Sequence, residues 1–391
     1  MKRAAVFCGP ALVLLAALVV YPIGYTIVRS LFGGDGESFV GLANYQEIFT
    51  SPETLTALRN NAVWVVLAPS LVTIAGLFFA VLTDRIRWAS AVKVVIFLPM
   101  AISFLAAGVT WRMVYEADPD RGIANAAIVT VHDAFADRPP YPGARLRSTE
   151  DTAGRFAVVG VPAPADGVQA TEGGSGVVWL DFAPGGGGRP GVIDPGEKGL
   201  PGVRVEAVRD GKVVAETTTG PDGRYTLPAG DHTIRLPDSN FAQPFNGVDW
   251  LGPSVVTPAI IGAYVWIWAG FAMVLISAGL AGIPRETLEA ARIDGASEWQ
   301  VLRRVTIPQL RPVLVVVWVT MVINVLKVFD LVLVLAPEAV QADANVVALQ
   351  MWRVSFGGAR DLGLGSALGV LLFLLVLPAM LFNLRRLRRE G

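Results

Sequence analysis

The chain has 391 residues, of which 53% are hydrophobic and only 17% are charged, and its formal net charge is −1. An average soluble domain carries about 25% charged residues, so this composition argues against a soluble globular protein and favours one that crosses a membrane several times. The single cysteine, Cys8, excludes a disulfide within the chain and argues against a cysteine-based metal site.

Six segments are long and apolar enough to cross a bilayer as helices, because one crossing needs roughly 20 apolar residues. They cover residues 4 to 23, 61 to 83, 94 to 115, 254 to 281, 313 to 336 and 363 to 384. We interpret the first as a retained span rather than a signal peptide, since its apolar run outlasts the usual core of about 7 to 15 residues. Moreover, Tyr21, Pro22 and Gly24 do not form a small-residue cleavage site.

Basic residues near the span ends predict the orientation, because Lys and Arg in short loops are held on the cytoplasmic side. They gather before span one, between spans two and three, between spans four and five, and after span six: Lys2, Arg3, Arg85, Arg87, Lys93, Arg285, Arg292, Arg303, Arg304, Arg311, Arg385, Arg386, Arg388 and Arg389. Both termini are therefore expected in the cytoplasm. Residues 116 to 253, with 12 basic and 19 acidic residues, are expected outside it.

The segment from 116 to 253 has the composition of a small β domain, which a bilayer could not accept. Two aspartate-glycine pairs, Asp210-Gly211 and Asp222-Gly223, separate short runs that alternate apolar and polar residues. Such pairs favour tight hairpin turns, because glycine tolerates positive φ. We predict a small antiparallel β-sandwich at about residues 172 to 240. His132 and His232 lie far apart in the insert and are expected to be solvated surface residues.

The same region resembles the prealbumin-like repeats of bacterial surface proteins, of the SdrD B type. About 60 residues carry the resemblance, from Gly176 to Leu236. The repeats of that family bind calcium through an acidic loop after the tryptophan. Here the loop after Asp181 offers few oxygen side chains, whereas calcium requires six to eight oxygen ligands. No metal or other cofactor is therefore expected.

The connection between spans four and five is predicted to form two short helices at an angle. Pro284 suits a first helical turn, and Gly295 ends that helix in the left-handed region. Ser297 opens the second helix, with Gln300 three positions later to complete a capping box. Pro308 is expected to stop it, because proline disfavours helical geometry in the preceding residue.

This connection, residues 282 to 312, resembles the EAA loop of permeases from binding-protein-dependent importers of the ATP-binding-cassette (ABC) type. The family pattern falls on Glu289, Ala290, Ala291, Asp294, Gly295, Ile307 and Pro308. The resemblance implies that the first helix docks in a cleft of a cytoplasmic ABC ATPase dimer and transmits its closure. The stretch from Pro10 to Tyr45 and the third and last spans are similar to the carbohydrate branch, which includes the membrane subunits of maltose transporters.

The resemblance implies an all-α polytopic permease of the type I importer class with an inserted extracytoplasmic β-sandwich, located in the bacterial inner membrane. Its parts are residues 1–115 with three spans, the insert 116–253, and 254–391 with three further spans. It implies a sugar or oligosaccharide delivered by an extracellular solute-binding protein, and a second homologous permease that completes the pore. No phosphate-binding GxxxxGK[ST] loop occurs, so the chain is expected to be a transporter subunit and not an enzyme. No nucleic-acid partner is expected.

Three polar residues in the fifth span, Asn324, Lys327 and Asp330, recur every three positions and are predicted to share one helix face. A charge in the hydrocarbon costs about 2.5 to 3.5 kcal/mol on insertion scales, so this face should meet a cavity. We predict that it lines the translocation path. The alternative is a Lys327–Asp330 pair near the outer boundary without substrate contact.

Other functional classes remain open at this stage. A secondary transporter would have similar spans but would not need the docking pattern around Glu289. A surface protein that only anchors its β domain would need one span, not six. An ABC importer for a solute other than a sugar is a third alternative. The sequence does not identify the solute, the role of the insert, or whether the second permease is another copy of this chain.

Overall fold

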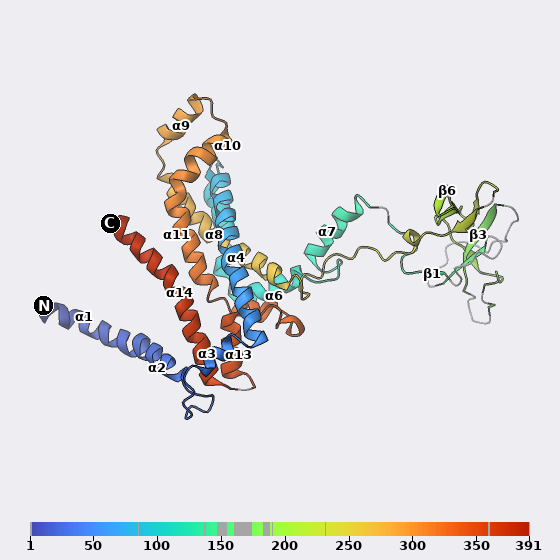
Figure 1. Cartoon of the computed structure of the whole chain (residues 1–391). Helices are drawn as coiled ribbons and strands as arrows, with labels where there is room; N and C mark the ends of the chain where they lie inside the picture. Colours follow the sequence, from blue (N-terminus) through green and yellow to red (C-terminus); the bar gives the residue numbers. More distant parts are fainter. Residues whose placement is uncertain are drawn as a thin grey trace. The chain divides into compact units, whose positions relative to one another are not determined.

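The computed structural model describes residues 2–84, 86–136, 138–146, 155–159, 174–182, 188–189, 191–230, 232–358 and 360–390. They form two compact units, Met1–Ala124 with Val248–Gly391, and Asn125–Gly247. Helices build the first unit, and the second contains the labelled β-strands (Figure 1). Some residues named in the predictions lie outside these described ranges. They are Arg85, between the second and third predicted spans, and residues 172–173, 183–187, 190 and 231 of the predicted β-sandwich.

Among the described residues, five helices are long and apolar enough to span a membrane: Cys8–Arg29, Pro52–Asp84, Val256–Ala281, Glu298–Val325 and Leu362–Leu381. The first comprises parts of α1 (Lys2–Leu15), η1 (Ala16–Val20) and α2 (Tyr21–Arg29). It continues beyond its expected end at residue 23. The fourth runs through α10 (Glu298–Val301), η4 (Leu302–Thr306) and α11 (Ile307–Val325).

The expected third span is a sharply bent pair rather than one straight helix. Ala89–Ala101, which comprises α5 (Ala89–Phe97) and η2 (Leu98–Ala101), meets α6 (Phe104–Val114) at 103°. The cause lies in the junction, where Ile102 is extended and Ser103 caps α6 by accepting a hydrogen bond from the Ala106 N–H at 3.2 Å. The span predicted for residues 94 to 115 is therefore present as a helix pair that is broken at residues 102–103.

Helix α8 (Val256–Ala281) is the most buried span and packs closely against α4 (Pro52–Asp84). Small residues permit this approach, since a Cβ at Gly76 would lie 2.5 Å from the Cβ of Ala272. The rings of Trp64 and Tyr264 meet edge to face, with centroids 5.5 Å apart. Helices α4, α8 and α11 consequently form the centre of this unit (Figure 1).

Pro308 does not end the second helix of the coupling connection, contrary to prediction. The chain passes from α10 through the π-helical turn η4 into α11, and Pro308 lies in the first turn of α11. A proline ring collides with the carbonyl four residues earlier in a regular α-helix. The wider π-helical turn Leu302–Thr306 includes that position, Arg304, and accommodates the ring without a break.

The fifth span ends earlier than expected, at Val325, and not at residue 336. Residues 326–329 leave the helix, and α12 (Asp330–Leu335) begins in a new direction after Phe329, whose φ and ψ are −143° and −65°. The chain continues through η5 (Glu338–Val340) and α13 (Val347–Phe356) into the last span, α14 (Leu362–Glu390).

Polar side chains tie α4 to the segment before α13. Asn60 donates from its amide to the carbonyls of Asp343 and Asn345, at 2.7 and 2.8 Å. Asn61 accepts from the backbone N–H of Val347 at 2.8 Å. These bonds fix the chain between α12 and α13 against the N-terminal part of α4. The remaining helices of this unit are α3 (Ala43–Ile48) and α9 (Arg285–Ile293).

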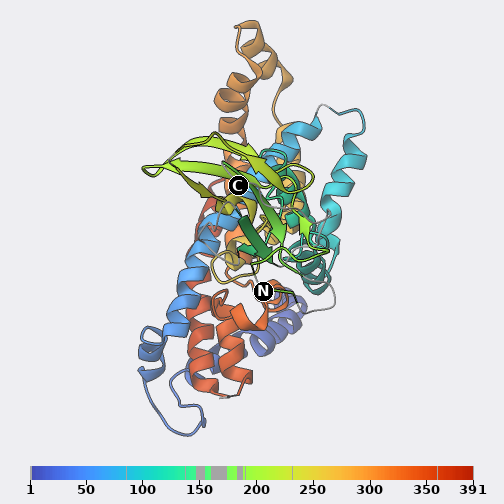
Figure 2. The same cartoon turned by 90° about the vertical axis from the view of Figure 1, so that its right-hand side faces the viewer.

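The second unit contains two small sheets (Figure 2). Residues of both sheets share one hydrophobic core. The larger has the order β1-β2-β3-β4 with β7 paired to β3, and the smaller has the order β6-β5-β8. Their bounds are β1 (Arg145–Leu146), β2 (Arg155–Val159), β3 (Ser175–Leu180), β4 (Lys198–Gly199), β5 (Arg204–Arg209), β6 (Lys212–Thr218), β7 (Arg224–Thr226) and β8 (Thr233–Arg235). Before them lies α7 (Ile123–Asp133), and η3 (Asp238–Asn240) follows.

The predicted turn at Asp210-Gly211 joins β5 to β6, with φ of 53° and 75° at these residues. Both values are positive, as a two-residue hairpin turn of type I′ requires. Within the predicted range of residues 172 to 240, the described strands pair antiparallel, as expected: β3 with β4 and β7, and β5 with β6 and β8. The strand β2 precedes that range and pairs with β3 in parallel. A parallel partner joins through a long connection, so local turn signals could not reveal it.

Candidate functional site

Helix α9 ends in a motif that favours glycine at its left-handed position. Gly295 has φ +85°. The N–H of Ala296 donates to the carbonyl of Ala291 at 3.1 Å, and the N–H of Gly295 donates to the carbonyl of Arg292 at 3.0 Å. These two bonds define a Schellman cap, in which a side chain at the left-handed position would be strained. The predicted helix end at Gly295 is confirmed, and Pro284 directly precedes the first helical residue.

The next helix, α10, begins with the predicted capping box. The N–H of Ser297 donates to Oε1 of Gln300 at 2.8 Å, and the N–H of Gln300 donates to the Ser297 hydroxyl at 3.4 Å. An ion pair joins the two helices, with Arg292 Nε 2.9 Å from Glu298 Oε1 and Nη2 3.5 Å from Oε2. The Glu298 carboxylate raises the pKa of Arg292 above its ordinary value. Local caps and one ion pair thus set the corner between α9 and α10.

The helix pair exposes large apolar side chains. No residue of α9 is buried, Ile293 is 85% exposed, and Trp299 is 66% exposed. Exposed apolar side chains grouped on one surface are typical of a contact with another protein. The residues of the predicted coupling pattern lie there or nearby: Glu289, Ala290, Asp294 and Gly295 are exposed, Ala291 is half-buried, and Ile307 and Pro308 lie at the start of α11, half-buried and exposed respectively.

A cavity of about 570 Å³ connects this corner to the spans. Leu288, Arg292, Glu298 and Trp299 line it from the helix pair. The other walls come from the end of α4, from α8 and from the start of the fourth long span: Val81, Leu82, Asp84, Ile86, Leu280, Val301, Leu302 and Thr306. Leu288 also packs against the main hydrophobic core. Helix α9 contacts α10 and η4, which continue into α11, so a force on α9 reaches α11 through these two segments.

The second feature is a smaller cavity of about 120 Å³ at the break after α11. The three polar residues predicted for the translocation path, Asn324, Lys327 and Asp330, all line it. They do not share a helix face as predicted, because α11 ends at Val325 and Asp330 begins α12. The break itself brings them together. Lys327 and Asp330, both described, form no ion pair with one another.

Two aromatic residues of α8, Tyr264 and Trp268, complete this cavity and were missed from the sequence. The Tyr264 hydroxyl and the Trp268 Nε1–H are buried and have no hydrogen-bond partner among the described residues. A buried polar group without a partner is costly, so such groups indicate a site that binds something polar. Their spacing of four residues within one apolar span was the available signal. Phe104, Val328, Phe329 and Leu331 form the remaining wall.

Several apolar spans, a polar cavity at a broken span and an exposed helix pair define a membrane transport subunit that works with another protein. Residues 227–387 match the family described as "Binding-protein-dependent transport system inner membrane component". The chain is 30% identical over 389 residues to the alpha-glucoside transport system permease protein AglF of Rhizobium meliloti, covering 98% of this chain and 82% of that protein. This chain belongs to that family of inner membrane components.

Other comparisons agree with this membership. The osmoprotective compounds uptake permease protein GgtC of Synechocystis sp. is 31% identical over 385 residues, covering 98% of each chain. A solved bacterial ABC transporter chain, described as involved in the import of the acidic polysaccharide alginate, matches with a TM-score of 0.59 at 16% identity. It covers 98% of this chain and 96% of that chain.

These findings confirm the predicted fold class, a polytopic helical permease of the ABC importer type whose insert carries small β-sheets. They also confirm a multi-pass membrane protein that acts as a permease subunit of an importer.

Proposed function

We propose that this permease imports a sugar or oligosaccharide, received from an extracellular binding protein, and that ATP hydrolysis by a separate cytoplasmic ATPase dimer supplies the energy. The exposed, glycine-capped helix α9 carries this proposal. Ala290 and Ala291 have small side chains, so a groove of the ATPase can approach the backbone of α9 closely. Ile293 supplies an apolar side chain that would be covered on docking.

The helix that follows α9 explains how docking reaches the transport path. Glu298–Val325 is one helical span of 28 residues and therefore roughly 42 Å long at about 1.5 Å per residue. Its first turn pairs with α9 through Glu298 and Arg292, and its last turn carries Asn324 in the polar cavity. A movement of α9 on ATPase closure would consequently displace a wall of the cavity about one membrane thickness away.

The cavity at Asn324 has the chemistry of a sugar path. Tyr264, Trp268 and Phe104 offer aromatic surfaces on which the C–H face of a sugar ring can pack, while Asn324 and the free Tyr264 hydroxyl can bind sugar hydroxyls. Similar proteins named for sugars support this class, including AglF and the trehalose/maltose transport system permease protein MalF of Thermococcus litoralis. The latter is 37% identical over 149 residues, covering 37% of this chain and 49% of that protein.

The basic residues in the connections support an orientation with both termini in the cytoplasm and residues 116–253 outside the cell. We retain the expected division into residues 1–115, the insert 116–253 and residues 254–391. A second permease, either a homologue or another copy of this chain, would complete the pore. A similar structure is described in complex with a periplasmic protein that holds an alginate pentasaccharide, which supports delivery by a binding protein.

A second candidate substrate class comes from the similarity to GgtC, a permease named for osmoprotective compounds. Under that alternative the importer has the same architecture and coupling but takes up a small compatible solute. Uptake measured with matched panels of oligosaccharides and osmoprotectants separates the two.

The decisive experiment reconstitutes the permease with its ATPase, second permease and binding protein in liposomes. We expect loaded binding protein to stimulate ATP hydrolysis, and solute to accumulate only when ATP is present. Uptake driven by an ion gradient without ATP would instead identify a secondary transporter. A purified assembly with no ATPase against α9 would overturn the proposal.

A further inference from the structure

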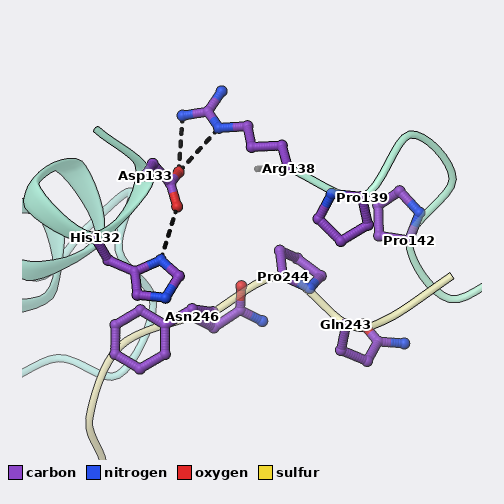
Figure 3. Close-up of a pocket in the computed structure, with 9 residues that line it drawn as sticks. His132, Asp133, Arg138, Pro139, Pro142, Gln243, Pro244 and Asn246 are labelled. Carbon is purple, nitrogen blue, oxygen red and sulfur yellow. Dashed lines mark hydrogen bonds and ion pairs between the residues drawn. The ribbon is translucent and has the colours of Figure 1, made fainter. Parts of the chain in front are cut away.

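A separate cavity lies within the second unit, Asn125–Gly247, and encloses about 560 Å³ (Figure 3). It forms between the end of α7 and two chain segments, 138–142 and 243–246. Its lining residues are His132, Asp133, Arg138, Pro139, Pro142, Gln243, Pro244, Phe245 and Asn246. Small-molecule sites usually measure about 300 to 1,000 Å³, so this cavity is large enough for a ligand of one or two rings.

The charges in this cavity balance one another. Arg138 contacts Oδ2 of Asp133 through Nε at 3.0 Å and Nη2 at 2.8 Å, and His132 Nδ1 lies 3.2 Å from Oδ1 (Figure 3). The hydrogen bond from His132 and the Arg138 guanidinium lower the pKa of Asp133, so this residue remains a carboxylate at neutral pH. A paired cation and anion leave no strong field of one sign, which disfavours an ionic ligand.

Apolar and hydrogen-bonding surfaces meet at the same opening. The His132 and Phe245 rings contact each other at an interplanar angle of 32°, with centroids 4.5 Å apart, and Pro139, Pro142 and Pro244 supply further apolar surface. The side-chain amides of Gln243 and Asn246 line the cavity and form no hydrogen bond with any described residue. Each free amide can donate and accept at once, which matches a hydroxyl group.

We propose that this cavity binds a neutral saccharide, with a ring C–H face against the aromatic and proline surface and with hydroxyls bonded to Gln243, Asn246 and Asp133. An apolar wall beside free amides suits a ligand that has both a C–H face and many hydroxyls. The ligand class follows from the cavity itself. Only the expectation that external solute reaches the cavity rests on the proposed function.

The test uses the purified full-length chain in lipid nanodiscs with maltose, trehalose and lactose as probes, and ligand-observed saturation-transfer NMR as the readout. We expect transfer to the sugar C–H protons in the wild type. The double variant Gln243→Ala with Asn246→Ala should lose the part of this transfer that arises at the insert cavity. Because neither side chain forms a hydrogen bond with a described residue, this variant should unfold at the same temperature as the wild type. An anionic digalacturonate should give less transfer than the neutral disaccharides.

Two comparisons separate this site from others. Gln46→Ala removes an exposed amide from the helical unit and should keep the signal of the wild type. The difference between the wild type and the double variant isolates transfer at this cavity from transfer at the membrane cavity. The proposal is overturned if no neutral probe gives transfer, if the double variant gives as much transfer as the wild type, or if digalacturonate is preferred. The saturation-transfer assay contains no ATPase. A negative result in it contradicts only sugar binding at this cavity, whereas a lack of ATP-driven uptake contradicts only the proposed function.

Discussion

The guanidinium of Arg292 and the carboxylate of Glu298 form a two-point ion pair across the corner between α9 and α10. One partner belongs to the proposed docking helix and the other to the first turn of the long helix that ends at the polar cavity. The pair is solvent-exposed, so its contribution to folding is small. We expect the pair to hold the angle between α9 and α10 fixed when closure of the ATPase moves α9.

Reversing one charge of this pair should weaken coupling without unfolding the protein. Glu298→Arg places two cations at the corner, and we expect solute-stimulated ATP hydrolysis in the reconstituted complex to fall on the order of a few-fold. The double variant Arg292→Glu with Glu298→Arg restores opposite charges and should recover most of the coupling. If the double variant is no better than the single one, the ion pair does not set the corner.

Gly295 should tolerate only residues that accept left-handed backbone. Gly295→Val requires a β-branched residue at φ +85°, at a cost of about 1 to 2 kcal/mol, and should disrupt the end of α9 and abolish coupling. Gly295→Asn should retain substantial activity, because asparagine adopts this conformation more readily. Transport that remains fully coupled in the valine variant would contradict the assignment of α9 as the docking helix.

The polar cavity predicts state-dependent access to water. A single cysteine at position 324, in a Cys8→Ala background, should react with a charged thiol reagent in one nucleotide state of the complex and be protected in another. Leu71→Cys provides the control, because Leu71 is a partly exposed apolar residue of α4 that should face lipid and stay unreactive. Protection of position 324 in every state would exclude it from the path.

Glu197 in the second unit should make stability depend on pH. Its side chain is buried, one carboxyl oxygen accepts from Trp179 Nε1 and from the Asp194 N–H, both at 3.0 Å, and the other has no partner among the described residues. Burial, together with nearby Asp181 and Asp194, raises the pKa of Glu197. The folded state therefore binds this proton more tightly than the unfolded state, so the free energy of unfolding should fall as pH rises above the ordinary glutamate value.

Glu197→Gln removes the buried charge and keeps an oxygen that can accept both hydrogen bonds. We expect the unfolding temperature of this unit to rise by a few degrees at pH 7, with a smaller difference from the wild type near pH 4. Differential scanning calorimetry of the full chain in nanodiscs at several pH values measures this. A variant that is less stable at pH 7 would show that the carboxylate is required.

The second unit should be removable without loss of the helical unit. Its ends lie close together, since a Cβ at Gly247 would be 2.4 Å from Oδ1 of Asn125. Replacing residues 126–246 by a short Gly-Ser linker should leave a folded permease, because α4, α8 and α11 pack on one another without the insert. Circular dichroism and basal ATPase activity of the complex test the fold, and saturation transfer from maltose should fall to the level of the double variant Gln243→Ala with Asn246→Ala.

The local sequence was sufficient to locate the spans and the caps of the coupling corner. Hydrophobic runs depend only on composition, and the caps at Gly295, Ser297 and Gln300 depend on residues within a few positions of each other. The prediction that Pro308 ends the helix was wrong. A proline in the sequence shows where a regular α-helix would be strained, but not whether a π-helical turn accommodates the ring.

Tertiary packing decided the rest. The break after Val325, the bend between η2 and α6, and the parallel pairing of β2 with β3 all depend on contacts between segments distant in sequence. The same holds for the polar cavity, where Tyr264 on α8 meets Asn324 on α11. The sequence alone determined which segments enter the membrane and where the docking helix ends, because those features arise from near neighbours. Only the folded chain could decide which polar groups share a cavity, because that depends on how whole helices pack.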